Sequence, residues 1–153
     1  MIATAADIMT RSVISTGPNT AVSDIATLLA KHGISAIPVI DVQGQLLGMV
    51  SEGDLMKPFL ANSNNRREWW LELLAEGERL APEYLQYIAQ DWHTAKDVMT
   101  KAVVTATPDT TTHDLAGLLV KHHIKRVPII DGASVVGIVS RADIVHTLAD
   151  SVS

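Results

Sequence analysis

The chain contains no cysteine among its 153 residues, which excludes disulfides, thiol nucleophiles and thiolate metal sites. No apolar run approaches the roughly 18 residues that a membrane-spanning helix needs. The first ten residues, MIATAADIMT, have neither the basic start nor the apolar stretch of a signal peptide. The absence of cysteine does not fix the compartment, but from the missing apolar run and signal peptide we expect a cytoplasmic protein with no membrane partner.

An excess of positive charge is also missing. The formal net charge is -5, whereas proteins that bind nucleic acid broadly are usually basic. We therefore expect no nucleic-acid partner, although a local group of cations would still suit a small anion. Apolar residues make up 47% of the chain, which is enough to form the core of one domain or of two closely packed subdomains.

An internal repeat covers most of the chain. The segment from Asp7 to Asp41 matches the segment from Asp97 to Asp131 at 16 of 35 positions without a gap. The second copy then lacks one residue, and the match resumes at Gly48 and Gly137. Such a repeat predicts two similar structural halves, residues 1–57 and 94–153, with an insert at 58–93 between them.

Each half has the pattern of a β-α-β-β-α unit. In the first half a strand at 12–15 precedes Gly17-Pro18, and a helix with one apolar face ends at Gly33. Thr20 or Ser23 is expected to cap the start of this helix. The strands AIPVID and LLGMV then follow, joined by a turn that contains Asp41 and Gly44, and Ser51 opens the closing helix. The apolar face of the first helix is formed by Val22, Ile25, Ala26 and Leu29.

The second half repeats these elements, with its own first strand at 102–105. Pro38 and Pro128 cannot donate a ladder hydrogen bond, so we expect them at strand starts or sheet edges. The insert holds all three tryptophans and both tyrosines, and its segments RREWWLELLAEGERL and PEYLQYIAQDW have helical spacing. Its aromatic residues either pack onto the two halves or a dimer mate, or form a surface for a regulatory partner.

The paired pattern D-h-M-T, h-P-h-h-D and G-h-V-S-x-x-D, with h an apolar residue, resembles a tandem CBS (cystathionine-β-synthase) domain pair. The Trp-Trp-Leu insert is similar to that of a bacterial group of stand-alone CBS-pair proteins, some of which continue into a further domain. The resemblance implies an α/β (α+β) fold of two pseudo-twofold related β-α-β-β-α motifs packed sheet to sheet, with a helical insert. It also implies a homodimer, and an adenosine derivative (AMP, ADP or ATP, less often S-adenosylmethionine or NAD) in clefts between the motifs.

The Ser-x-x-Asp ending of the second half carries the chemistry of the better candidate site. Ser140 and Asp143 lie at a strand-to-helix junction, where helix amides favour a phosphate. Taken alone, this spacing is also that of an ordinary helix capping box, and both interpretations can hold together. The resemblance implies that the serine and the aspartate line the nucleotide cleft, with the carboxylate binding the ribose hydroxyls.

Lys125 and Arg126 align with a basic pair that contacts phosphates in the gamma subunit of AMP-activated kinase, a protein of this family. The alternative is that both are solvated surface cations. By the same resemblance, an apolar slot for adenine would include Thr107, although its apolar members could instead belong to the core. The complete second-half set is Thr107, Lys125, Arg126, Val127, Pro128, Ser140, Arg141 and Asp143.

The first half departs from this pattern. Ser35 and Ala36 stand where the second half has its basic pair, and Glu52 stands where it has Arg141. This site is therefore the weaker candidate, or one for an uncharged adenosyl ligand. Its members would be Gly17, Ser35, Ala36, Ile37, Pro38, Ser51 and Asp54.

We expect no metal site, because the adjacent His122 and His123 point in different directions on a helix and chelate poorly. No nucleophile elbow, phosphate-binding loop or zinc-protease motif is present, so we expect no enzyme. The sequence predicts a regulatory module that binds an adenine nucleotide and signals by a conformational shift to an effector protein or a missing C-terminal domain. The alternative is a ligand-free dimerisation or scaffold module with degenerate clefts.

Overall fold

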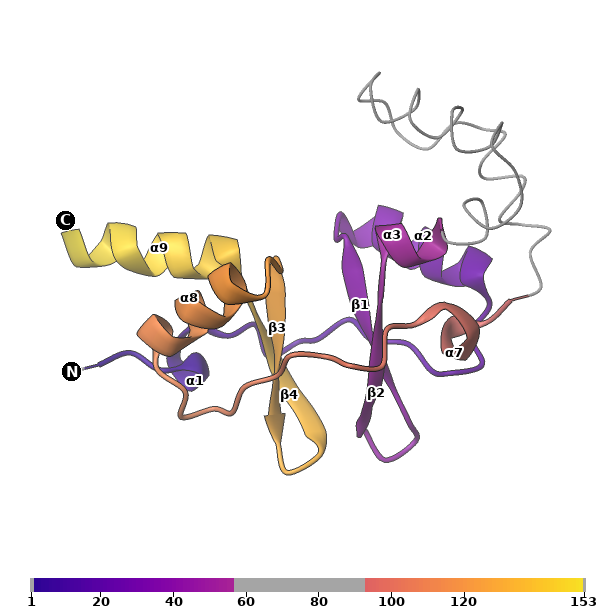
Figure 1. Cartoon of the computed structure of the whole chain (residues 1–153), viewed down its shortest axis with the longest axis horizontal. Helices are drawn as coiled ribbons and strands as arrows, with labels where there is room; N and C mark the ends of the chain where they lie inside the picture. Colours follow the sequence, from indigo (N-terminus) through magenta and orange to yellow (C-terminus); the bar gives the residue numbers. More distant parts are fainter. Residues whose placement is uncertain (1, 57–92, 153) are drawn as a thin grey trace, which may run out of the picture. The chain divides into compact units, whose positions relative to one another are not determined.

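The computed structural model describes residues 2–56 and 93–152, and within these ranges it contains helices and two small antiparallel sheets (Figure 1). The helices are α1 (Ala5–Ile8), α2 (Val22–His32), α3 (Glu52–Leu55), α7 (Ala95–Val98), α8 (Thr112–Lys121) and α9 (Arg141–Val152). The strands are β1 (Ala36–Ile40), β2 (Leu46–Ser51), β3 (Arg126–Asp131) and β4 (Ser134–Ser140). The predicted mixed fold is confirmed. The predicted helices of the insert lie outside the described residues.

The chain divides into two compact units, and each unit combines parts of both copies of the repeat. The first, called here the β3–β4 unit, comprises Met1–Ser15, Ile40–Leu46 and Ala102–Ser153. The second, the β1–β2 unit, comprises Thr16–Val39 and Leu47–Lys101. Each unit thus holds most of one copy together with the opening segment of the other. The motif boundaries at 57 and 94 remain predictions.

Backbone hydrogen bonds fix each opening segment to the hairpin of the other copy. Thr10 and Ile138 exchange two bonds, with N···O distances of 2.9 Å and 3.0 Å. Thr100 and Met49 exchange the equivalent pair at 2.8 Å and 3.0 Å. The opening segments therefore act as an additional partner for β4 and β2, which would otherwise leave backbone groups without a partner.

Two equivalent glycines allow this close approach. A Cβ atom placed on Gly48 would lie 2.8 Å from the carbonyl oxygen of Thr100 and from the sulfur of Met99. A Cβ atom on Gly137 would collide in the same way with the side chain of Met9. Both strands thus have glycine where another stretch of backbone crosses them closely, as expected for glycine inside a strand.

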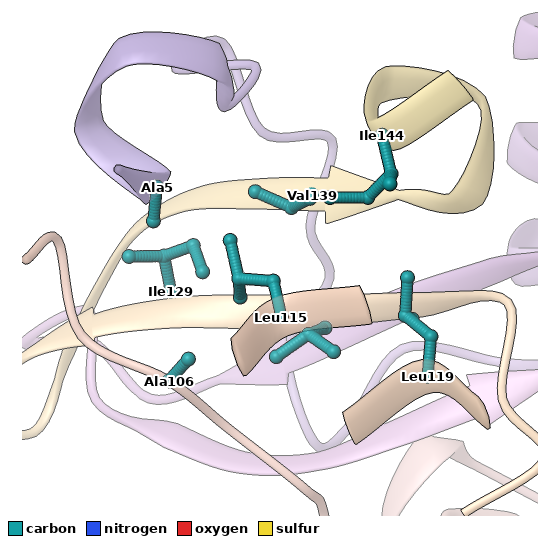
Figure 2. Packing of buried hydrophobic residues seen from close by; sticks show 8 residues of the cluster. Ala5, Ala106, Leu115, Leu119, Ile129, Val139 and Ile144 are labelled. Atoms are coloured by element: carbon teal, nitrogen blue, oxygen red, sulfur yellow. The ribbon is translucent and has the colours of Figure 1, made fainter. Parts of the chain in front are cut away.

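The core of the β3–β4 unit draws on α1, α8, α9 and the hairpin (Figure 2). Leu115, Ile129 and Val139 are fully buried at its centre. Burying an aliphatic side chain of this size contributes about 1.5–3 kcal/mol, so this cluster dominates the stability of the unit. The whole cluster consists of Ala5, Ala106, Leu115, Leu119, Val127, Ile129, Val139 and Ile144.

Helix α2 confirms most of the sequence prediction. The four apolar residues predicted for its inner face are buried, and it ends at Gly33 with φ 62°. The predicted caps at Thr20 and Ser23 are wrong, because the N-cap is Ala21 and no side chain caps the helix. The Thr20 hydroxyl instead accepts a hydrogen bond from the Gly17 N–H at 3.3 Å and closes the preceding turn.

The strands predicted at 12–15 and 102–105 are wrong. Each is replaced by a single bridging residue, Thr16 beside Val39 and Ala106 beside Ile129. A proline follows each bridging residue by two positions and has no N–H with which to extend a ladder.

Pro38 and Pro128 are each the third residue of their strand and so do not lie at strand starts, but the alternative expectation of a sheet edge is confirmed, because each sheet has only two strands. The Pro128 carbonyl accepts a hydrogen bond from the Ala106 N–H at 3.1 Å, which shows that this residue's polar groups face away from β4. The missing N–H of Pro128 therefore removes no bond of the hairpin.

We predict that Gly48→Ala and Gly137→Ala both lower the free energy of unfolding, each by about 1–3 kcal/mol from overpacking. Gly48→Ala should be the more damaging change, because it meets a fixed backbone carbonyl, whereas Gly137→Ala meets a methionine side chain that can repack. Urea unfolding of the purified proteins measures the difference. The control is Gly117→Ala, in α8, where nothing lies within 4 Å; it should stabilise by about 0.5–1 kcal/mol. A Gly48→Ala protein as stable as the control would contradict the close approach.

We predict that His123→Gly stabilises the protein by about 1 kcal/mol. His123 follows α8 with φ 54°, a left-handed conformation that is costly for a residue with a Cβ atom, and the first copy has Gly33 at the equivalent position. Thermal unfolding followed by circular dichroism should show a higher midpoint. His122→Gly is the matched control, because its φ of -97° gains nothing from glycine. An equal rise in both variants would contradict this explanation.

Candidate functional site

Three cationic residues gather where the β3–β4 hairpin meets α9. The register of the hairpin pairs Arg126 with Ser140, the last residue of β4. The backbone N–H of Arg141 donates to the carbonyl oxygen of Lys125 at 2.9 Å. Lys125 and Arg141 are exposed, and Arg126 is half-buried. We call Lys125, Arg126 and Arg141 the cationic cluster.

The Ser140–Asp143 pair forms a capping box at the start of α9. The Ser140 N–H donates to Asp143 Oδ2 at 2.8 Å, and the Asp143 N–H donates to the Ser140 hydroxyl at 3.2 Å. The capping interpretation of the sequence motif is therefore confirmed. Within the described ranges Asp143 Oδ1 accepts no hydrogen bond, and no buried side-chain oxygen there lacks a partner. Oδ1 is consequently open to solvent and available to a ligand.

A capping box is not by itself the mark of a site in this protein. Thr4 with Asp7 and Thr94 with Asp97 form the same box at the starts of α1 and α7. Hydrogen bonds from the Thr94 backbone and hydroxyl lower the pKa of Asp97, because they stabilise its carboxylate. Asp143 shares this local geometry with the two other aspartates and differs in its place, at the end of the hairpin that carries Lys125, Arg126 and Arg141.

This arrangement places charges of both signs within one small region. The first-turn amides of α9 and the cationic cluster attract an anion such as a phosphate. The free oxygen of Asp143 accepts hydrogen bonds from hydroxyl groups. A ligand that carries both a phosphate and a pair of hydroxyls fits this combination.

The residues predicted to line an adenine slot lie on β3, directly after Arg126, and on the segment that pairs with β3 at Ala106. The bond from the Ala106 N–H to the Pro128 carbonyl oxygen brings the following residue, Thr107, close to β3. Thr107 is exposed, and its hydroxyl bonds Asp109 Oδ1 and the Thr110 hydroxyl. Val127 is fully buried in the core cluster, so its side chain is a core residue and only its backbone can face a ligand.

The equivalent place in the β1–β2 unit has the same backbone but different side chains. The Glu52 N–H donates to the Ser35 carbonyl oxygen at 2.9 Å, just as Arg141 does to Lys125. Asp54 is 6% exposed, and its Oδ2 accepts bonds from the Ser51 N–H at 2.9 Å and the Ser51 hydroxyl at 3.1 Å. The hydroxyl of Thr100 donates to Asp54 Oδ1 at 3.2 Å, so both carboxylate oxygens are used.

The remaining residues of the first-half set offer little to a ligand. Ala36, Ile37 and Pro38 are buried in β1, and Gly17 donates its N–H within its own turn. Sequence reasoning missed Thr100, whose partner Asp54 lies 46 positions away in the chain. The repeat gave no sign of it, since Thr10 occupies the same place in the other copy without bonding Asp143 in the described structure.

Neither metal binding nor membrane insertion finds support in the residues that the structure describes. No group of three His, Asp or Glu side chains there is placed to hold a metal ion. No helix in that part of the chain has the length and apolar character to cross a bilayer.

Comparison with known proteins agrees with the duplicated architecture. The model of the CBS domain matches residues 5–60 and again 95–150. An uncharacterized protein of Methanocaldococcus jannaschii, MJ1426, is 31% identical over 150 residues, which are 93% of this chain and 89% of that protein.

Solved structures show the same fold. The CBS domain pair of MJ0100, in complex with 5′-methylthioadenosine and S-adenosyl-L-methionine, matches with a TM-score of 0.71 and 26% identity over 99% of both chains. The CBS-pair protein CBSX2 from Arabidopsis thaliana matches with a TM-score of 0.76 and 25% identity over 99% of this chain and 97% of that one. Two family matches that cover most of the sequence, on two copies of one fold, show that this chain belongs to the CBS domain family as a tandem pair of CBS motifs.

Proposed function

We propose that this chain is a non-catalytic regulatory module that binds an adenine nucleotide of the AMP, ADP or ATP class in the β3–β4 unit. One observation carries the proposal. Asp143 has a carboxylate oxygen open to solvent, and it lies in the first turn of α9 at the junction whose backbone also positions Lys125, Arg126 and Arg141. This combination suits a nucleotide, because a nucleotide joins ribose hydroxyls to an anionic tail.

Each part of the nucleotide has a partner. The phosphates bind the first amides of α9 and the cationic cluster, in which the arginine side chains can form bidentate bonds. The 2′- and 3′-hydroxyls of the ribose donate to Asp143 Oδ1. The adenine base lies against Thr107 and the backbone of Val127 and Pro128, where backbone groups supply its hydrogen bonds.

Relatives support an adenosine derivative as the ligand. MJ0100 binds 5′-methylthioadenosine and S-adenosyl-L-methionine. CBSX2, which is 27% identical over 134 residues, has been solved in complex with AMP. The cationic cluster favours the anionic tail of a nucleotide over the positively charged sulfonium of S-adenosylmethionine, because like charges repel. Among these ligands we therefore place AMP, ADP and ATP first, and S-adenosylmethionine and NAD after them.

Signalling requires that the nucleotide bind one conformation of the chain more tightly than another. The readout would be an effector protein or a further domain, and we expect the active form to be a homodimer, as the CBS resemblance implies. The scaffold alternative has one observation in its favour, namely that both oxygens of Asp54 are already used. That observation concerns the β1–β2 unit and leaves the β3–β4 unit free to bind.

We predict that Asp143→Ala weakens AMP binding at least tenfold, because a hydrogen bond to a charged group contributes about 1.5–3 kcal/mol. Isothermal titration calorimetry of the purified chain measures the affinity. Asp7→Ala is the matched control, since it breaks the same kind of capping box in the same unit and leaves Asp143 and the cationic cluster unchanged in sequence. It should lower thermal stability and leave the affinity unchanged.

If Asp143→Ala and Asp7→Ala weakened AMP binding equally, the effect would come from lost stability and not from a lost contact with the ligand. Weakening by Asp54→Ala alone would place the site in the β1–β2 unit. Folded protein that binds none of AMP, ADP, ATP, NAD and S-adenosylmethionine would favour the scaffold alternative.

We also predict that Arg141→Glu, which copies the Glu52 of the first repeat, weakens ATP binding at least tenfold and changes adenosine binding little. The substitution replaces a phosphate-binding cation with an anion and leaves the ribose partner intact. Competition between the two ligands in calorimetry separates these effects. Lys31→Glu, in the β1–β2 unit, makes the same change in net charge and should alter neither affinity. An equal loss of adenosine binding would contradict a phosphate role for Arg141.

A further inference from the structure

The two Ser-x-x-Asp endings have the same backbone bonds and different carboxylates. In both, a serine N–H donates to Oδ2 of the aspartate, at 2.9 Å for Asp54 and 2.8 Å for Asp143. The difference lies in the other oxygen. Asp54 Oδ1 accepts a bond from Thr100 at 3.2 Å, whereas Asp143 Oδ1 has no partner in the described structure.

The position of Thr100 does not explain this difference by itself. Thr100 and Thr10 are equivalent in the repeat, and each exchanges two backbone bonds with the hairpin of the other copy. Of these two hydroxyls, that of Thr100 alone bonds an aspartate among the described residues, with contacts of 3.2 Å and 3.5 Å to the two oxygens of Asp54. Asp54 is also buried, whereas Asp143 is half-exposed.

We propose that Thr100 closes the first-copy site by occupying the carboxylate of Asp54, and that the chain consequently binds one nucleotide and not two. This inference rests on the proposed function, since it assumes that the aspartate of each copy is the ribose partner. Thr100 is then a specificity-determining residue that selects which copy of the repeat binds.

The physical reason is an exchange of equivalent bonds. A ribose hydroxyl that enters the first site has to displace the Thr100 hydroxyl from Asp54, and it gains only the bond that is lost. It must also separate Thr100 from a buried carboxylate, which leaves the threonine hydroxyl in need of another partner. At Asp143 the same ribose hydroxyl replaces only solvent.

The charges around Asp54 decide which ligand the opened site would take. Ser35 and Ala36 replace two of the cations, and Glu52 replaces the third. A phosphate would find no positive side chain among these three positions, and Glu52 would repel it. The opened site therefore suits an adenosyl compound without phosphate, for which 5′-methylthioadenosine is a suitable probe.

The test is Thr100→Val, which removes the hydroxyl and keeps the shape of the side chain. AMP and 5′-methylthioadenosine are titrated in turn into the full chain by calorimetry, and the stoichiometry is read together with the affinity. In the native chain we expect one site. In Thr100→Val we expect a second site for 5′-methylthioadenosine. Its affinity should be at least about tenfold higher than that of the same site in the native chain, and adding Asp54→Ala should abolish it.

Thr10→Val is the matched control, because Thr10 makes the same backbone bonds without bonding an aspartate, and it should leave one site. One site in both the native chain and Thr100→Val would overturn the role of Thr100 and leave the proposed function standing. Two sites in the native chain would also overturn the role of Thr100. A native chain that binds neither probe would refute the proposed function. In that case the role of Thr100 would be supported only if Thr100→Val gained a site that Asp54→Ala removes. If neither protein binds a probe, both proposals fail.

Discussion

The whole arrangement depends on the backbone pairing between each opening segment and the hairpin of the other copy. The bonds of Thr10 with Ile138 and of Thr100 with Met49 are the reason that neither repeat forms a compact unit alone. Glycine at 48 and 137 is the condition for this pairing, because a side chain at either position would push the crossing segment away. Duplication thus produced two copies that each complete the fold of the other.

The candidate site is built from a helix capping box of the kind that also begins α1 and α7. The capping box holds Asp143 by one oxygen, which fixes the carboxylate and leaves the second oxygen for binding. A carboxylate oriented in this way loses little conformational entropy when a ligand arrives. The stability of α9 and the binding of ribose therefore depend on one side chain, and a control such as Asp7 is needed to separate them.

The helices and hairpins could be predicted from short stretches of sequence, because the spacing of apolar residues indicates which face is buried and turn-forming residues mark where an element ends. Gly33, with its left-handed φ, and the apolar face of α2 are examples. The predicted strands at 12–15 and 102–105 failed, since residue type alone did not reveal that only one residue of each would pair. The grouping of Lys125, Arg126 and Arg141 followed from the repeat and the family resemblance. The bond between Thr100 and Asp54 did not, because it joins residues far apart in the chain and the described structure has no such bond between the equivalent Thr10 and Asp143.

The difference between the copies shows how a duplicated site can lose its ligand without losing its fold. A carboxylate at this junction must be satisfied whether or not a ligand is present, because a buried charge without partners is costly. In the second copy the Ser140 N–H and solvent meet this requirement, and the site stays open. In the first copy the Thr100 hydroxyl satisfies the carboxylate, and Asp54 is buried. Cations that bind a phosphate are then no longer needed beside it. The replacement of those cations by Ser35, Ala36 and Glu52 is what such a loss of phosphate binding would permit.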